Sequence, residues 1–124
     1  MILADTSIWV DFLGKRGDPL LEQLLENEQV VMHPFIISEL ALGNLSKREI
    51  LLRSLAELPQ TRMATIDEAM HLLHQARLYG MGIGFVDLHL LAATLLSEDV
   101  SLWTRDKRLR EACLRAKAPL FSTH

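Results

Sequence analysis

Short apolar runs alternate along the chain with longer segments in which apolar residues recur every three or four positions. A short apolar run predicts a strand that is buried on both faces, whereas the longer recurrence predicts a helix with one apolar side. The strand-like runs lie at residues 1–4, 29–33 and 100–103, with a weaker run at 61–64 and a short last one at 119–121.

The segments between these runs carry the start and stop signals of helices. Pro34 suits a first helical turn, where its missing N–H would have no partner in any case. The pair Gly43-Asn44 then predicts a left-handed end to that helix, and Ser46 with Glu49 three residues later predicts a capping box for the next one. The helices are expected at 7–13, 19–27, 34–42, 46–58, 67–79, 85–96 and 107–116.

This alternation of strands and helices predicts a parallel sheet covered by helices on both sides. Crossover connections between parallel strands are right-handed in almost all proteins, which fixes how the chain winds. The expected fold is therefore α/β: a three-layer α/β/α sandwich with a parallel, Rossmann-like central sheet. A length of 124 residues suits a single domain over residues 1–124.

Composition narrows the class of protein further. Hydrophobic residues make up 49% of the chain, which is enough for a core and argues against disorder. The single cysteine, Cys113, excludes an intrachain disulfide and suits a reducing compartment. No basic region precedes the N-terminal apolar run, and the longest apolar stretch, 83–96, is shorter than a membrane span. We therefore expect a soluble, cytoplasmic protein that does not span a membrane.

The formal net charge of −3 is unfavourable for a protein that binds nucleic acid through overall charge. Basic residues are nevertheless concentrated in the last fifth of the chain, where only Asp106 and Glu111 offset them. An acidic site beside a basic border would suit a metal-dependent nuclease, whereas a solvated helix face is the alternative for each basic residue alone. The basic residues are Arg105, Lys107, Arg108, Arg110, Arg115 and Lys117.

Four acidic residues are expected at one edge of the predicted sheet. Parallel strands all end at the same edge, and ligand sites gather there. Asp5 follows the first strand directly, and Glu39 lies in the early turns of the helix after the second strand. Asp87 lies near the start of the very apolar helix, and Asp106 comes just after a later strand.

Each of these acids also has an ordinary structural interpretation. Asp106 is well placed to cap the helix at 107–116, and this interpretation is favoured when the residue is taken alone. Asp5 could likewise cap the helix that begins near Ser7, and Glu39 could be a surface residue.

The neighbours of Glu39 and Asp87 argue for a shared site instead. Both lie among apolar residues without a Lys or Arg within a turn, and charges on apolar faces are rarely buried without a partner. Two like charges about 4 Å apart repel by roughly 4 kcal/mol at an effective dielectric constant near 20, a large part of a stability of about 5–15 kcal/mol. The acids are therefore either partly protonated or neutralised by a divalent cation, and oxygen ligands favour Mg²⁺ or Mn²⁺ over zinc.

At these residues the chain resembles the PIN-domain nucleases. The matching features are Asp5-Thr6-Ser7 after the first strand, Glu39, Asp87 at the start of Asp-Leu-His-Leu-Leu-Ala-Ala-Thr, and Thr104-Arg105-Asp106. Within this family the chain is similar to the VapC toxins of bacterial and archaeal toxin–antitoxin pairs. The resemblance extends over essentially the whole length, and the ordered set of motifs is what makes it specific.

The resemblance implies a function and the residues that perform it. It implies an endoribonuclease that hydrolyses RNA with Mg²⁺ or Mn²⁺, and it implies the acidic metal site Asp5, Glu39, Asp87 and Asp106. Ser7 and Thr104 are implied as supporting hydroxyls that hydrogen-bond the acids or a nearby water. In the family the substrates are mostly transfer RNAs or a ribosomal RNA loop.

The resemblance also implies partners. We expect a homodimer that is inhibited by a small VapB-like antitoxin, whose tail would cover the acidic groove. The alternative from another class is a catalytically silent module of the same fold that binds RNA or a protein. Buried, unpaired carboxylates disfavour that alternative, because a binding surface gains nothing from them.

Several other residues are expected to be structural. Cys113, Trp9, Trp103 and Phe85 lie in apolar surroundings and are expected in the core. The glycine-rich segment 80–84 follows a helix rather than a strand, so it predicts a connecting loop and not a dinucleotide site.

Overall fold

A three-stranded parallel sheet lies at the centre of the protein, for which the computed structural model describes residues 1–14 and 17–122. The strands are β1 (Ile2–Ala4), β2 (Val30–Val31) and β3 (Ser101–Trp103), in the order β2-β1-β3. The central strand β1 pairs in parallel with both neighbours. The predicted parallel sheet is therefore confirmed in the described residues.

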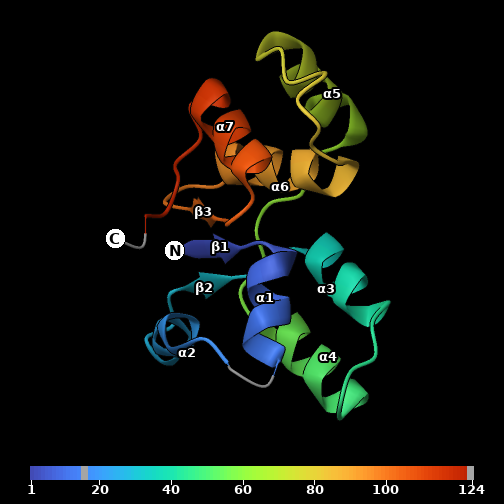
Figure 1. Ribbon diagram of the computed structural model, residues 1–124, viewed down its shortest axis with the longest axis vertical. Helices are drawn as coiled ribbons and strands as arrows, with labels where there is room; N and C mark the ends of the chain where they lie inside the picture. Colours follow the sequence, from blue (N-terminus) through green and yellow to red (C-terminus); the bar gives the residue numbers. More distant parts are fainter. Residues whose placement is uncertain (15–16, 123–124) are drawn as a thin grey trace.

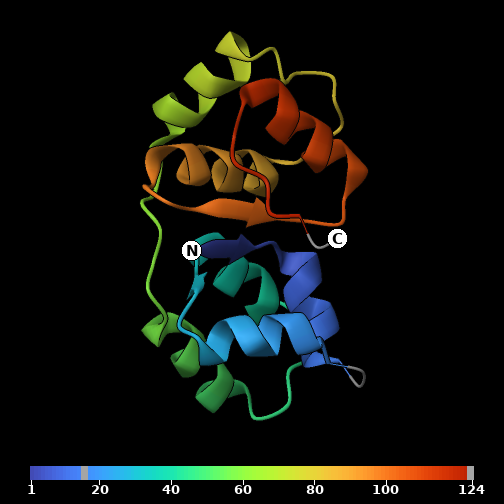
Figure 2. The same ribbon diagram turned by 90° about the vertical axis from the view of Figure 1, so that its left-hand side faces the viewer.

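Helices lie on both sides of this sheet. Figures 1 and 2 show α5, α6 and α7 on the side of β3, and α1 to α4 on the other side. The sheet is thus enclosed between two groups of helices, which confirms the α/β sandwich. The bounds of the helices are Thr6–Leu13 for α1, Pro19–Glu26 for α2, Pro34–Ala41 for α3, Arg48–Glu57 for α4, Ile66–Gln75 for α5, Phe85–Leu96 for α6 and Lys107–Ala116 for α7.

The core forms where α6 packs on the sheet. Leu3 of β1, Leu90 and Leu91 of α6, and Leu102 of β3 are all fully buried. Because α6 is apolar nearly all round, it can be covered by α5 on one side and by β3 on the other. Among residues 1–14 and 17–122, no helix combines the length and the apolar character that crossing a membrane requires.

Two predicted strands are wrong, because each is reduced to a single bridge. Met32 pairs with Gln60 beyond the end of β2, and Leu102 pairs with Leu120 at the other edge of the sheet. Each bridge consists of two backbone hydrogen bonds, to Pro59 and Thr61 at one edge and to Pro119 and Phe121 at the other, and pairing extends no further in the described residues. They cover the two sheet edges at one point each.

The predicted junction between α3 and α4 is also wrong. The left-handed residue in this junction is Lys47, with φ 50°, and Gly43 does not adopt that conformation. Lys47 is the N-cap of α4 and makes no side-chain hydrogen bond, so the capping box expected at Ser46 is absent. The Arg48 guanidinium instead donates to the carbonyls of Ala41 and Gly43, which satisfies the end of α3 in place of a left-handed glycine.

Candidate active site

The carboxyl ends of β1 and β3 lie side by side where the order of the strands reverses. The chain runs from β1 to β2 and later returns to β3 on the opposite side of β1. Open α/β sheets bind their ligands at such a switch point. Asp5 follows β1 and Thr104 follows β3, and the Asp5 N–H donates to the Trp103 carbonyl over 2.9 Å. Residues almost 100 positions apart in the sequence therefore meet at this edge.

The Asp5 carboxylate is buried and held by several donors. Its Oδ1 accepts from the Ser7 hydroxyl at 2.6 Å and from the Ile8 N–H at 3.1 Å. Its Oδ2 accepts from the Thr104 hydroxyl. The bond from Ile8 makes Asp5 the N-cap of α1, so this structural interpretation is correct. Ser7 and Thr104, which the sequence suggested as supporting hydroxyls, both hydrogen-bond Asp5.

Glu39 lies on the exposed surface of α3. The expectation that it is a charge on a buried apolar face is therefore wrong, because α3 buries Ile36 and Leu40 and leaves Glu39 exposed. Its Oε1 accepts a hydrogen bond from the Thr6 hydroxyl at the start of α1. Thr6 was not singled out in the sequence, although it is the middle residue of the Asp5-Thr6-Ser7 motif. This contact brings Glu39 to the segment that directly follows Asp5.

Asp87 is half-buried in the first turn of α6. Its Oδ2 accepts from the Gly84 N–H at 3.4 Å, which closes the start of the helix. Burial raises the pKa of this carboxyl above its usual value, although the Gly84 N–H works in the opposite direction. The negative charges of Asp5, Asp106 and Glu39 raise the pKa of Asp87 further. Asp87 therefore experiences the charge of every other acid predicted for the site.

Asp106 is the N-cap of α7, as its structural interpretation predicted. Its Oδ1 accepts from the N–H groups of Arg108 and Leu109 at 2.8 and 3.1 Å, and its own N–H donates to the Thr104 hydroxyl at 3.0 Å. Thr104 thus connects Asp5 with Asp106. The capping role uses only Oδ1, and the exposed carboxylate keeps its second oxygen for another partner.

The four acids influence one another but are not gathered around a common point. Within the described part of the chain, no group of three or more His, Cys, Asp or Glu side chains is arranged to hold a metal ion as it stands. Their chemistry nevertheless suits a divalent cation, since all offer carboxylate oxygens and their charges disfavour ionisation of Asp87.

The imidazoles of His33 and His89, which the sequence did not assign to the site, are buried. His33 caps α3, with its Nδ1 accepting from the Phe35 N–H at 2.9 Å. His89 is 2% exposed, and neither of its ring nitrogens has a hydrogen-bond partner in the described structure. Its ring packs against Phe35 and Phe85, with centroids 4.9 and 4.5 Å apart. The position of His33 directly before Pro34, in an apolar segment, is the sequence feature that could have predicted this N-cap.

The residues expected in the core are buried with one exception. Trp9, Trp103 and Cys113 are almost inaccessible, and burial raises the pKa of the Cys113 thiol to about 12, which makes it unreactive. Phe85 is 54% exposed, so its expected place in the core is wrong. It is the first residue of α6, and its ring covers His89 from the outside.

Comparisons with known proteins agree with the fold. The family described as "PIN domain" matches residues 2–114. Ribonuclease VapC32 from two strains of Mycobacterium tuberculosis is 42% identical over 120 residues, which cover 97% of this chain and 96% of the relative.

Two solved structures share the fold at lower identity. The crystal structure of FitAcB from Neisseria gonorrhoeae superposes with a TM-score of 0.65 at 20% identity, over 98% of this chain and 97% of that one. A structure of FitAB bound to a DNA fragment gives a TM-score of 0.66 at 17% identity, over 98% and 94% of the two chains. At these identities the likeness concerns the fold alone.

Proposed function

Because the chain belongs to the PIN-domain family and is similar to its VapC ribonucleases over nearly its full length, we propose that it hydrolyses the phosphodiester bonds of RNA. The observation that carries this proposal is the raised pKa of Asp87, which results from burial and from the charges of Asp5, Asp106 and Glu39. Acids that disfavour one another's ionisation at a sheet switch point are typical of a site that neutralises them with a cation.

The proposed site consists of Asp5, Glu39, Asp87 and Asp106, which would hold one or two divalent cations, Mg²⁺ or Mn²⁺. The carboxylate oxygens of these residues are the hard ligands that such ions prefer. When bound, the cation would lower the pKa of a water molecule and stabilise the negative charge that develops on the leaving oxygen.

The residues of the chain would position the reactants. Ser7 and Thr104 fix the orientation of the Asp5 carboxylate, and Thr6 fixes that of Glu39. Because a bound cation would offset the charges that raise the pKa of Asp87, this carboxylate would serve as a ligand, and the proton that the attacking water loses would pass to solvent. Attack of water on phosphorus with departure of the 3′ oxygen leaves products with 5′-phosphate and 3′-hydroxyl ends.

We further propose that the protein is the toxin of a VapBC-type pair. A VapB-like antitoxin would inhibit it, the active form would be a homodimer, and the substrate would be a transfer RNA or a ribosomal RNA loop. The similarity to a VapC ribonuclease over 97% of the chain supports the toxin role.

A catalytically silent binding module of the same fold is the second candidate. Two observations favour it. Asp5 and Asp106 already serve as helix caps. Among the described residues, no group of three or more His, Cys, Asp or Glu side chains is arranged to bind a metal ion. The two candidates differ in whether removing a carboxylate abolishes RNA cleavage or leaves an unchanged binding activity.

The decisive experiment is cleavage of total RNA by the antitoxin-free protein with Mn²⁺ or Mg²⁺, with and without EDTA. We expect cleavage only with the metal, and a loss of at least about 100-fold for Asp5→Asn and for Asp87→Asn, since even partners of metal ligands cost about 10- to 100-fold. Asp99→Asn is the matched control, because Asp99 is an exposed turn residue outside the site.

Two results would contradict the proposal. Cleavage that persists in EDTA, or in both variants, would remove the metal site from the mechanism. Products that end in a 2′,3′-cyclic phosphate would show that the 2′-hydroxyl of the RNA attacked rather than water. Sequencing of the cleaved ends identifies the RNA and separates transfer RNA from ribosomal RNA.

A further inference from the structure

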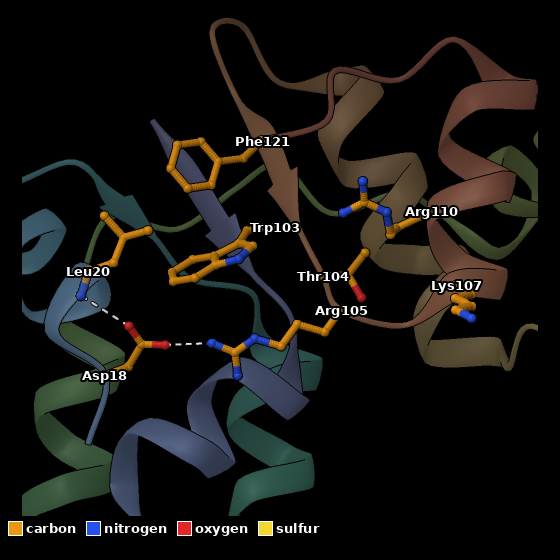
Figure 3. A pocket seen from close by; sticks show the side chains of 8 residues that line it. All are labelled: Asp18, Leu20, Trp103, Thr104, Arg105, Lys107, Arg110 and Phe121. Atoms are coloured by element: carbon orange, nitrogen blue, oxygen red, sulfur yellow. Dashed lines mark hydrogen bonds and ion pairs between the residues drawn. The ribbon is translucent and has the colours of Figure 1, made fainter. Parts of the chain in front are cut away.

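A pocket of about 400 Å³ opens beside the candidate active site, between the start of α2, the end of β3 and the start of α7. This volume lies in the range of about 300–1,000 Å³ that is usual for ligand pockets. Figure 3 shows Leu20, Trp103 and Phe121 on one side of the pocket and Lys107 and Arg110 on the other. The pocket therefore combines an apolar wall with a basic wall.

The pocket and the acidic site share Thr104. This residue lines the pocket, and its hydroxyl donates to the Asp5 carboxylate. Lys107 directly follows Asp106 in the sequence and begins α7. A molecule in the pocket would consequently lie next to the acids of the candidate active site.

The positive charge of the basic wall is not compensated. Arg105 lies between the two walls, and its guanidinium pairs with Asp11 and, at 2.7 Å, with Asp18, which also lines the pocket, so these three groups together carry a net charge of −1. In the described residues, no ion pair or side-chain hydrogen bond joins Lys107 or Arg110 to another group. Two cations thus remain available in a chain whose net charge is −3.

The paired Arg105 guanidinium adds a flat surface to the apolar wall. Asp11 and Asp18 hold its guanidinium from two sides, its carbon Cζ lies 5.9 Å from the centre of the Trp103 ring, and its side chain is 50% exposed. Nucleobases stack on guanidinium planes and on aromatic rings, and lysine and arginine bind phosphates. A ligand with a flat ring and a phosphate, which is a nucleotide, matches both walls.

We propose that this pocket binds one nucleotide of the RNA strand next to the bond that is cut. The phosphate lies between Lys107 and Arg110, and the base lies against Arg105 and Phe121. The proposal rests on the proposed ribonuclease function and assigns to it a substrate-binding site outside the acids. An acidic segment of a protein partner is the competing occupant, and the test separates the two.

The test is binding of a fluorescein-labelled single-stranded RNA in EDTA, measured by anisotropy over a series of salt concentrations. The double variant Lys107→Gln/Arg110→Gln is expected to bind at least about 100-fold more weakly, because two charge-assisted hydrogen bonds to a phosphate are lost and each accounts for about tenfold. Its slope of log affinity against log salt should fall by about 0.7, the value for one phosphate on a single strand. Arg53→Gln on α4 is the matched control and should bind as the unaltered protein does.

The position of the base is tested by photocrosslinking. RNA that contains 4-thiouridine is expected to crosslink to the peptides with Arg105 or Phe121. Circular dichroism checks that the variants fold, and the single variant Lys107→Gln, at an exposed position, provides a second measurement if the double variant does not fold.

The outcomes separate this proposal from the proposed function. Equal RNA affinity of the double variant and the unaltered protein overturns the pocket while RNA cleavage by the unaltered protein still stands. If the double variant binds an acidic peptide more weakly than the unaltered protein does but binds RNA equally well, the pocket belongs to a protein partner. This result also overturns the proposal that the pocket binds a nucleotide. Failure of the unaltered protein to bind RNA at low salt in EDTA also overturns it, because Lys107 and Arg110 need no metal. If the double variant loses RNA binding while the unaltered protein binds RNA but does not cleave it, the nucleotide pocket is supported and the proposed function is contradicted.

Discussion

At the residue scale, the Asp87 carboxyl connects the structure of the site with the stability of the protein. Burial and the charges of Asp5, Asp106 and Glu39 raise its pKa in the folded state above the ordinary value of 3.8. For an acid, a raised folded-state pKa means that the folded state binds the proton more tightly than the unfolded state. Ionisation of Asp87 therefore costs stability at pH values above the raised pKa, and this cost disappears below pH 3.8.

We predict that Asp87→Asn stabilises the protein in the absence of divalent cations. The amide has a similar shape and carries no charge, so at pH 7 in EDTA the Tm should rise by a few degrees. The measurement is differential scanning calorimetry at pH 7 and at pH 3, where the difference between the two proteins should vanish.

Added Mn²⁺ should reverse this order. A cation at 100 times its Kd stabilises the folded protein by about 2.7 kcal/mol if it binds only the folded state. The unaltered protein should gain this stability and Asp87→Asn should not, while Asp99→Asn should gain it fully. If Asp87→Asn is less stable than the unaltered protein in EDTA, this result contradicts the charge repulsion at Asp87 on which the prediction depends.

At the scale of the element, the start of α3 depends on a neutral histidine. The Nδ1 atom of His33 can accept from the Phe35 N–H only while it carries no proton. Burial, and then the nearby His89, lower the pKa of His33 to about 4. Because the folded-state pKa is lower than the unfolded value of 6.5, the stability from neutral His33 is complete above pH 6.5. It is lost progressively as the pH falls toward 4.

We predict that His33→Asn weakens this dependence on pH. The asparagine oxygen can cap α3 as Nδ1 does, but it does not titrate. Between pH 7 and pH 4 the unaltered protein should lose about 3 kcal/mol more of its unfolding free energy than the variant, at 1.36 kcal/mol for each pKa unit.

Urea unfolding at both pH values measures this difference. His71→Asn is the matched control, because His71 is exposed on α5 and should leave the pH dependence unchanged. Parallel losses of stability in the unaltered protein and His33→Asn would show that His33 titrates normally.

At the scale of the whole molecule, several large apolar side chains are not covered by the chain itself. They include Leu42, which is 88% exposed, and Leu114, which is 68% exposed. Ile50 and Ile66 are each 64% exposed. Contact with a second copy or a partner would remove such surface from water, at about 25 cal/mol for each Å². This surface suits the proposed homodimer without identifying the face that forms it.

We predict that the antitoxin-free protein has twice the 14.1 kDa mass of the chain. Light scattering coupled to size exclusion measures the mass, and dilution should eventually yield the monomer. High salt should leave an apolar dimer intact, because salt screens charges and not hydrophobic contacts. A mass of 14.1 kDa at every concentration would contradict the homodimer.

Elements whose signals are local and extend over many residues were predictable from the amino-acid pattern alone. The bounds of α6 and α7 agree with their prediction, because an apolar helix of 12 residues and a capped amphipathic one of 10 carry their signals within themselves. The parallel sheet was predictable from the alternation of strand-like runs and helices along the whole chain. The short segments 61–64 and 119–121 were not, since a few residues do not reveal whether a neighbouring strand continues to pair with them.

Contacts between groups that are distant in the sequence became visible only in the folded protein. The pairing of Thr6 with Glu39, the burial of His33 beside His89 and the capture of Arg105 by Asp11 and Asp18 all join separate elements. Sequence periodicity assigns a residue to a face of its own helix, but it does not state what the neighbouring element places opposite that face. The sequence thus predicted the four acids as a set, and their role as metal ligands stays a prediction. The fold decided that Thr104 joins them to a basic pocket.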